Sequence, residues 1–247
     1  MAAPLLPQAP IDEVVVGVVL DQPIGPNAVE AGFYLAQRLD TFSLHEIHEP
    51  ILPAPGWIDV PGPVRVWLVS ADGTQLVQLQ QDRFHANWRR RGESVYPGFS
   101  RDGGAMHFAI SEFSRLQEFC GRIRGGQTPN AASFELSKID LLIQGKHWQD
   151  VREAAAIVPV LAPALDAMSK PSPNITLQFQ ERIDDTSVTI SITPARMKAN
   201  PDMSAFRLEF RAQQPAADNM GMQLAAMNTK LNEAFARVVP DYAKRFS

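Results

Sequence analysis

One stretch of the sequence carries side chains that could bind a ligand. It runs Gln78-Leu-Gln-Gln-Asp-Arg-Phe-His-Ala-Asn-Trp-Arg-Arg-Arg91. Alternate side chains of an extended segment point to opposite faces. One face is then expected to carry the polar side chains Arg83, His85 and Asn87. The other is expected to carry Phe84, Ala86 and Trp88. A row of guanidinium, imidazole and amide groups could bind a carboxylate, a phosphate or the backbone of a protein partner, and Trp88 could anchor such a contact.

The expected binding residues continue beyond this row. They are Arg83, His85, Asn87, Trp88, Arg89, Arg90, Arg91 and Tyr96. The alternative is a half-solvated strand whose aromatic side belongs to the core and whose final arginines form a solvated charge run, because antiparallel sheets ordinarily expose one face to water.

Three consecutive arginines also raise the question of nucleic acid. The formal net charge is -4 and the pI about 5.7, so no overall basic field attracts phosphates. A cluster of three arginines gives few phosphate contacts. Nucleic acid is therefore not expected as a partner, whereas local binding of an anion stays open.

A second segment, His45-Glu-Ile-His-Glu49, resembles part of a zinc-hydrolase signature. Helical zinc ligands are spaced four apart, whereas His45 and His48 are three apart in a segment expected to be extended, which directs them to opposite faces. In a helix they could still converge, with Glu49 as a third ligand. We expect no metal and no cofactor.

No catalytic residues are expected. The sequence has no Gly-x-Ser-x-Gly, Ser-x-x-Lys or His-Glu-x-x-His pattern, and these patterns position the nucleophile or metal of common hydrolases. Cys120 falls in a predicted helix where burial would leave it inert. Asp184 and Asp185 occupy a predicted turn, where aspartate bonds to nearby backbone. The chain is therefore expected to be a binding protein rather than an enzyme.

Composition and charge are typical of a globular protein, with 45% apolar and 20% charged residues. The single cysteine excludes an internal disulfide. Residues 1–10 contain three prolines and no lysine or arginine, unlike a signal peptide. No run approaches the roughly 18 apolar residues of a membrane span. We expect a cytoplasmic protein without a membrane partner.

The order of the predicted strands and helices indicates an α+β fold of two similar β-α-β-β-β-α halves, with antiparallel sheets covered by helices. Hydrophobic periodicity predicts strands over 13–20, 42–51, 64–70 and 76–88 with helices over 28–39 and 105–123, and then strands over 134–144, 175–181, 187–193 and 206–210 with helices over 150–168 and 220–239. Val29, Phe33, Leu35, Ala36 and Leu39 are expected largely on one side of the first helix. The Gly125-Gly126 pair favours a boundary between domains 1–126 and 127–247.

The chain resembles a sporadically distributed family of bacterial proteins of similar length and uncharacterised function. The shared features are Pro10-Ile-Asp-Glu13 before the first strand, the Gln-x-x-x-Asp-Arg-Phe-x-x-Asn-Trp pattern over Gln78 to Trp88, and Tyr96-Pro97. In the second half the family tends to carry Tyr-Ile-Asn where this chain has Lys138-Ile-Asp140, and histidine where it has Asn228. The resemblance implies a bacterial cytoplasmic setting. Scattered distribution is typical of accessory genes such as defence or toxin-antitoxin components.

Three functional hypotheses follow. The leading one is a non-enzymatic protein-interaction or accessory protein that presents its sheet faces and residues 83–91 to a protein partner; a homo-oligomer is left open. The second is a small-molecule or anion sensor, with a pocket between sheet and helix and the polar row of residues 83–87 facing inward. The third is a metal-dependent hydrolase that uses residues 45–49.

Overall fold

A computed structural model describes residues 11–23, 26–48, 65–197, 200–217 and 219–240. The strands are Ile11–Leu20 (β1), Phe42–His48 (β2), Arg65–Ser70 (β3), Gln75–Gln80 (β4), Arg83–Arg89 (β5), Ala131–Ile143 (β6), Leu177–Ile183 (β7), Thr186–Met197 (β8) and Asn200–Pro215 (β9). The helices are Ala28–Ala36 (α1), Ala105–Ile123 (α2), Val151–Ile157 (α3), the 3-10 turn Pro159–Leu161 (η1), Ala162–Asp166 (α4) and Met220–Val238 (α5). None of these described helices is both long and apolar enough to cross a membrane.

The fold is α+β, as the sequence predicts. In the part of the chain that the structure describes, nine strands form one sheet in the order β2-β3-β4-β5-β1-β6-β9-β8-β7. The pairs β2·β3, β3·β4, β4·β5, β7·β8 and β8·β9 are antiparallel. The single strand predicted over 76–88 is wrong, because the chain turns at Gln81-Asp82 and forms two antiparallel strands, β4 and β5.

The described residues belong to two compact units. The N-terminal unit comprises residues 14–136 and 214–225, and the C-terminal unit comprises residues 11–13, 137–213 and 226–240, apart from the gaps noted above. Between α1 and α2 the described residues include four strands where three were expected, and the helix expected over 150–168 is divided at its prolines. The duplication of the halves and the boundary near residue 126 stay predictions.

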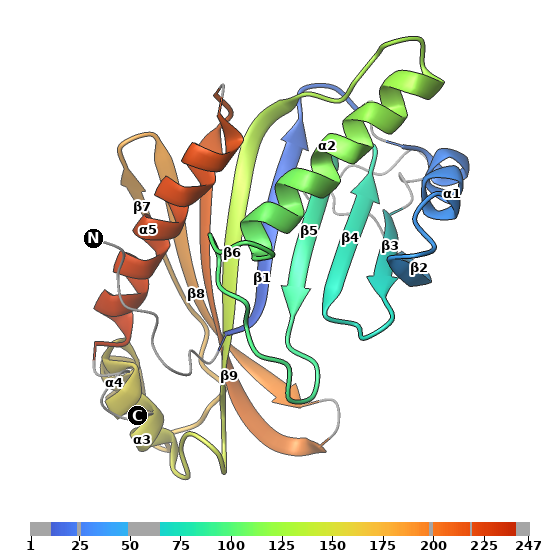
Figure 1. Cartoon of the computed structure of the whole chain (residues 1–247). Helices are drawn as coiled ribbons and strands as arrows, with labels where there is room; N and C mark the ends of the chain where they lie inside the picture. The colour runs from blue at the N-terminus through green and yellow to red at the C-terminus, as the bar shows by residue number, and fades with distance from the viewer. Residues whose placement is uncertain (1–10, 24–25, 49–64, 198–199, 218, 241–247) are drawn as a thin grey trace, which may run out of the picture. The chain divides into compact units, whose positions relative to one another are not determined.

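In the N-terminal unit, α2 lies across β5 on one face of the sheet (Figure 1). The Phe84 ring of β5 contacts the Phe113 ring of α2, with centroids 5.4 Å apart. Helix α1 packs on α2 through Tyr34 and Phe119, at 5.3 Å. Cys120 is fully buried in α2, and this burial raises the pKa of its thiol.

Helix α1 begins with an Asn27 cap, whose side chain accepts hydrogen bonds from the backbone of Val29 and Glu30. Its orientation differs from the expected one. Val29, Phe33 and Leu39 are 68%, 61% and 63% exposed, whereas Tyr34 is buried. Tyr34 is turned inward because its hydroxyl donates a hydrogen bond to buried Glu112 of α2, as does the guanidinium of Arg38 just beyond the helix. These two hydrogen bonds, rather than the apolar face of α1, decide which side of the helix is buried.

In the C-terminal unit, the predicted arrangement of a helix across an antiparallel sheet is confirmed. Val188, Ile190 and Ile192 of β8 are buried on one face, and their neighbours in sequence are polar and at least partly exposed. The Phe210 ring of β9 contacts the Phe235 ring of α5 at 5.4 Å. Helix α5 therefore covers the apolar face and leaves the polar face open.

Candidate functional site

Strand β5 separates the predicted polar and aromatic rows as expected, but the side chains from Phe84 to Trp88 are all buried and Arg83 is partly buried. On the helix side, Trp88 is 6% exposed and its ring lies 5.1 Å from that of Tyr96. On the opposite face, His85 and Asn87 are 7% and 2% exposed. These side chains therefore contact the interior of the protein, and none of the three is available as an open contact surface.

The polar row is held by partners from two strands and a turn. Arg83 donates to Asp82 in the preceding turn at 3.0 Å. His85 Nε2 lies 3.6 Å from Glu135 Oε2 of β6. Gln78 of β4 donates from Nε2 to Asn87 Oδ1 at 3.1 Å. The row is thus fixed in place by charged and amide groups, as a preorganised site requires.

Beside this row lies a second group, which we call the Trp67 cluster. It consists of His48 of β2, Arg65 and Trp67 of β3, Gln78 of β4 and Arg89 of β5. In the strand register Trp67 is opposite Gln78, and Gln78 is opposite His85, so the cluster and the polar row share the face away from α2. This juxtaposition depends on three strand pairs, β2·β3, β3·β4 and β4·β5.

Three basic side chains converge on the Trp67 ring. His48 stacks on it with centroids 3.8 Å apart. The guanidinium carbons of Arg65 and Arg89 lie 5.3 and 5.6 Å from its centroid. Cation–π contacts stabilise each arginine, but like charges gathered at one ring repel one another. The cluster is therefore electrostatically suited to an anion.

The positive charge of the Arg65 guanidinium has no nearby carboxylate among the described residues to neutralise it. Its Nη1 donates to the neutral amide of Gln78 at 3.4 Å, and no carboxylate among the described residues lies within 4 Å of it. Burial lowers the pKa of Arg65, because the charged form loses water without gaining a counterion. The nearby Glu46 carboxylate bonds instead to His48 Nε2, at 2.8 Å.

The hydrogen-bond donors of the cluster that are buried without an acceptor include Nε of Arg65 and Nε1 of Trp67. Buried donors are satisfied in the great majority of cases, by protein or by ordered water. An acceptor bound at this cluster would satisfy both and would also offset the arginine charges.

The rest of the predicted binding set is spread over the end of β5. Arg89 joins the Trp67 cluster, and its backbone continues the β4·β5 hairpin by donating to Thr74. Arg91 is exposed, and its Nη1 donates to the carbonyl of Arg90 at 2.7 Å. The structure thus brings only Arg89 of the arginine run to the cluster.

The histidine pair behaves as its spacing predicts. His45 is opposite Leu68 and His48 is opposite Arg65 in an extended β2, so the two imidazoles lie on opposite faces. Glu49, the third ligand considered, lies outside the described residues. Within the part of the chain that the structure describes, no three His, Cys, Asp or Glu side chains gather as a metal site would need.

Arg65, Trp67 and Glu135 are the site residues that sequence reasoning missed. The signal for the first two was the alternation of arginine and tryptophan in Arg65-Val-Trp67, which places both side chains on one face of a strand. Glu135 gave no local signal, because its role depends on pairing across the sheet. Comparison with protein-family models, with curated proteins and with solved structures gives no match for this chain.

Proposed function

We propose that this chain is a non-enzymatic binding protein whose N-terminal unit holds an oxyanion, a carboxylate or a phosphate, at the Trp67 cluster. The observation that carries the proposal is the pair of buried donors without acceptors, Arg65 Nε and Trp67 Nε1. They lie in one cluster with a second arginine, Arg89. A bound oxyanion supplies several acceptors and a negative charge at once.

The energetics favour an anion over a neutral acceptor. An unsatisfied buried donor costs about 1 to 3 kcal/mol, and a hydrogen bond to a charged partner contributes about 1.5 to 3 kcal/mol. A water molecule would satisfy the donors, but only an anion would also offset the charges of Arg65 and Arg89. The proposal keeps the small-molecule or anion sensor hypothesis but changes the expected position of the site. The Trp67 cluster lies on the sheet face away from α2, whereas the pocket was expected between sheet and helix.

Calorimetric titration with inorganic phosphate and, separately, with acetate tests the proposal. Arg65→Gln and Trp67→Phe each remove one of the two donors and should weaken binding by about 10-fold or more. Arg91→Gln removes the same charge from an exposed residue outside the cluster and should leave binding unchanged. If neither anion binds the wild type, or if all three variants bind alike, the proposal is wrong.

A protein partner is the second candidate, and a different surface favours it. Val29 and Phe33 on α1 and Ile47 on β2 are between 61% and 73% exposed, and β2 is the end strand of the sheet. Exposed apolar side chains and an edge strand together suit the addition of an extended segment from another protein. This surface replaces residues 83–88 as the expected contact, since Trp88 is buried.

Capture of partners from a bacterial host extract tests this candidate. A Phe33→Ser/Ile47→Ser variant should lose a partner that the wild type retains. Val95→Ser changes another apolar side chain, which is 83% exposed, and should retain it. No partner, or equal loss in both variants, would remove the candidate. The cytoplasmic location and the accessory role in a bacterial system stay proposals that rest on the family resemblance.

A further inference from the structure

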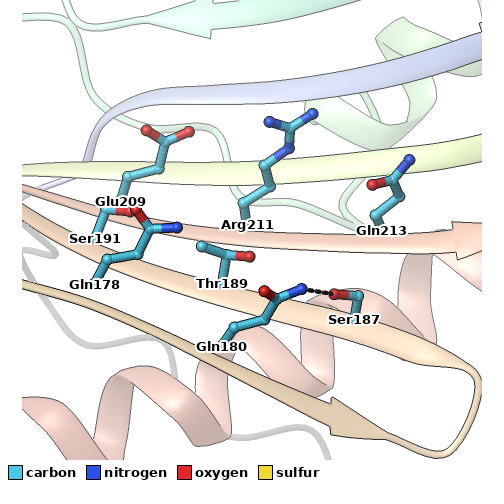
Figure 2. A pocket seen from close by; sticks show the side chains of 8 residues that line it. All are labelled: Gln178, Gln180, Ser187, Thr189, Ser191, Glu209, Arg211 and Gln213. Carbon is cyan, nitrogen blue, oxygen red and sulfur yellow. Dashed lines mark hydrogen bonds between the residues drawn. The ribbon is translucent and has the colours of Figure 1, made fainter. Parts of the chain in front are cut away.

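The open face of the C-terminal unit carries a groove that the proposed function does not use. Its floor and walls come from β7, β8 and β9, and its volume is about 290 Å³. The side chains that line it are Gln178, Gln180, Ser187, Thr189, Ser191, Glu209, Arg211 and Gln213. Figure 2 shows these side chains on one side of the three strands.

The shape of the groove follows from side-chain length. The strand register places Thr189 of β8 between Gln180 of β7 and Arg211 of β9. In the next row, Ser191 lies between Gln178 and Glu209. Short hydroxyl side chains on the central strand, with long ones on both neighbours, leave a trough that runs along β8.

The trough is long and narrow. From Ser187 to Ser191, at roughly 3.4 Å per residue, it runs for about 14 Å. Its walls stand on strands two sheet spacings apart, or about 10 Å between backbones. A single small ring would leave much of this length empty, so the dimensions suit an elongated ligand.

The lining selects a neutral, polar ligand. Six of the eight side chains are amides or hydroxyls, and the remaining two, Glu209 and Arg211, carry opposite charges. Amides and hydroxyls both donate and accept hydrogen bonds. Gln180 of the β7 wall already donates to Ser187 on the β8 floor, at 3.1 Å (Figure 2).

The same lining argues against an apolar or highly charged ligand. None of the eight groove residues is aliphatic or aromatic, so a peptide with apolar side chains would find no partner for them. The central strand of the groove carries short hydroxyl side chains in three successive rows, at Ser187, Thr189 and Ser191.

We infer that this groove binds a neutral linear oligosaccharide. The hydroxyl floor and the amide walls match the alternating donors and acceptors along a sugar chain. Without an aromatic platform, stacking contributes nothing and the affinity should lie near the millimolar range.

NMR titration of the full chain with maltohexaose, cellohexaose and chitohexaose tests the inference, with a twelve-residue Gly-Ser peptide as the alternative ligand. One of the sugars should shift the side-chain amide signals of Gln178, Gln180 and Gln213. Thr189→Arg fills the floor of the trough and should abolish the shifts. Thr229→Arg adds the same side chain at an exposed site on α5 and should leave them intact.

A second variant guards against misfolding at β8. Gln180→Ala shortens one wall without adding bulk and should weaken binding several-fold while the unfolding midpoint is unchanged. The inference is overturned if no sugar shifts these amides, if Thr189→Arg and Thr229→Arg respond alike, or if the peptide alone binds. Phosphate binding at the Trp67 cluster is measured separately, so either proposal can fail without the other.

Discussion

The imidazole of His85 on β5 lies directly against Gly17 on the neighbouring strand β1. A Cβ atom at position 17 would stand 2.7 Å from His85 Cδ2 and 3.1 Å from the Cβ of Glu135. The glycine therefore makes room for the His85–Glu135 pair. A side chain in the middle of this strand would have to displace one of the two.

Gly17→Ala should destabilise the protein by about 1 to 3 kcal/mol, the usual cost of overpacking a core. The double variant Gly17→Ala/His85→Ala removes the clash with the imidazole, the closest of these contacts, so it should lose less stability than the sum of the two single losses. Urea unfolding of all three variants measures the coupling. Gly32→Ala is the control: no atom lies within 4 Å of the added methyl, and alanine in a helix is favoured by up to about 1 kcal/mol. Additive losses would show that His85 does not depend on Gly17.

Helices α1 and α2 are joined through one buried carboxylate. Glu112, 1% exposed, accepts hydrogen bonds from Tyr34 at 3.2 Å, Arg38 at 2.7 Å and Arg115 at 2.5 Å. Burial and then the Glu112 charge raise the pKa of Tyr34 well above its ordinary value, so the phenol stays a donor.

Glu112→Gln keeps the shape but removes the charge, and should cost about 3 kcal/mol, because Arg38 is left partly buried without its counterion. Glu118→Gln makes the same change at an exposed position of the same helix and should cost little. Thermal and urea unfolding measure both. Equal stability of the two variants would mean that α1 is held by packing alone.

The elements predicted correctly from the sequence are those with a long hydrophobic periodicity and with capping or turn residues at their ends. Helix α5 matches its predicted span within one residue, because apolar residues recur over five turns. The turn between β4 and β5 was missed because Gln81-Asp82 contains neither glycine nor proline. Tertiary bonds reversed the face of α1, since Glu112, more than seventy residues away, decides which side of that helix is buried.

The candidate site was only partly predictable for a related reason. The polar row of β5 could be read from alternation in one segment. The Trp67 cluster could not, because the partners of Trp67 come from three other strands whose register is set by the fold. Sequence patterns specify faces, whereas neighbours across a sheet depend on which strands pair.

The turn between β7 and β8 is tied to α5 by one lysine. Lys230 Nζ donates to Thr186 Oγ1 at 2.8 Å and to the Ile183 carbonyl at 3.2 Å. Lys230→Met should lose about 1 to 3 kcal/mol, because fully buried Thr186 loses a charged partner. Lys146→Met, at an exposed site, is the matched control in urea unfolding. If both variants are as stable as the wild type, the lysine does not hold the turn.

Lys138 on β6 should make stability depend on pH in the alkaline range. Its side chain is 9% exposed, and Nζ donates to Asn232 Oδ1 at 2.5 Å. Burial lowers the pKa of Lys138 to about 8, although the charge of Asp140 opposes the shift. An unfolded lysine has a pKa of about 10.4. Between these two values the unfolded chain binds more protons than the folded one, so the folded state gains stability as the pH rises.

Urea unfolding of the wild type and Lys138→Met between pH 7 and pH 10.5 measures this dependence. The free energy of unfolding of the wild type, relative to the variant, should rise through the window from about pH 8 to about pH 10.4, by on the order of 3 kcal/mol in all. Subtracting the variant removes titrations that both proteins share. Lys170→Met, at an exposed position, should run parallel to the wild type. If the pH dependence of the free energy of unfolding is the same for the wild type and Lys138→Met, the prediction is wrong. Lys138 would then titrate as it does in the unfolded chain, and its burial would not disfavour the charged form.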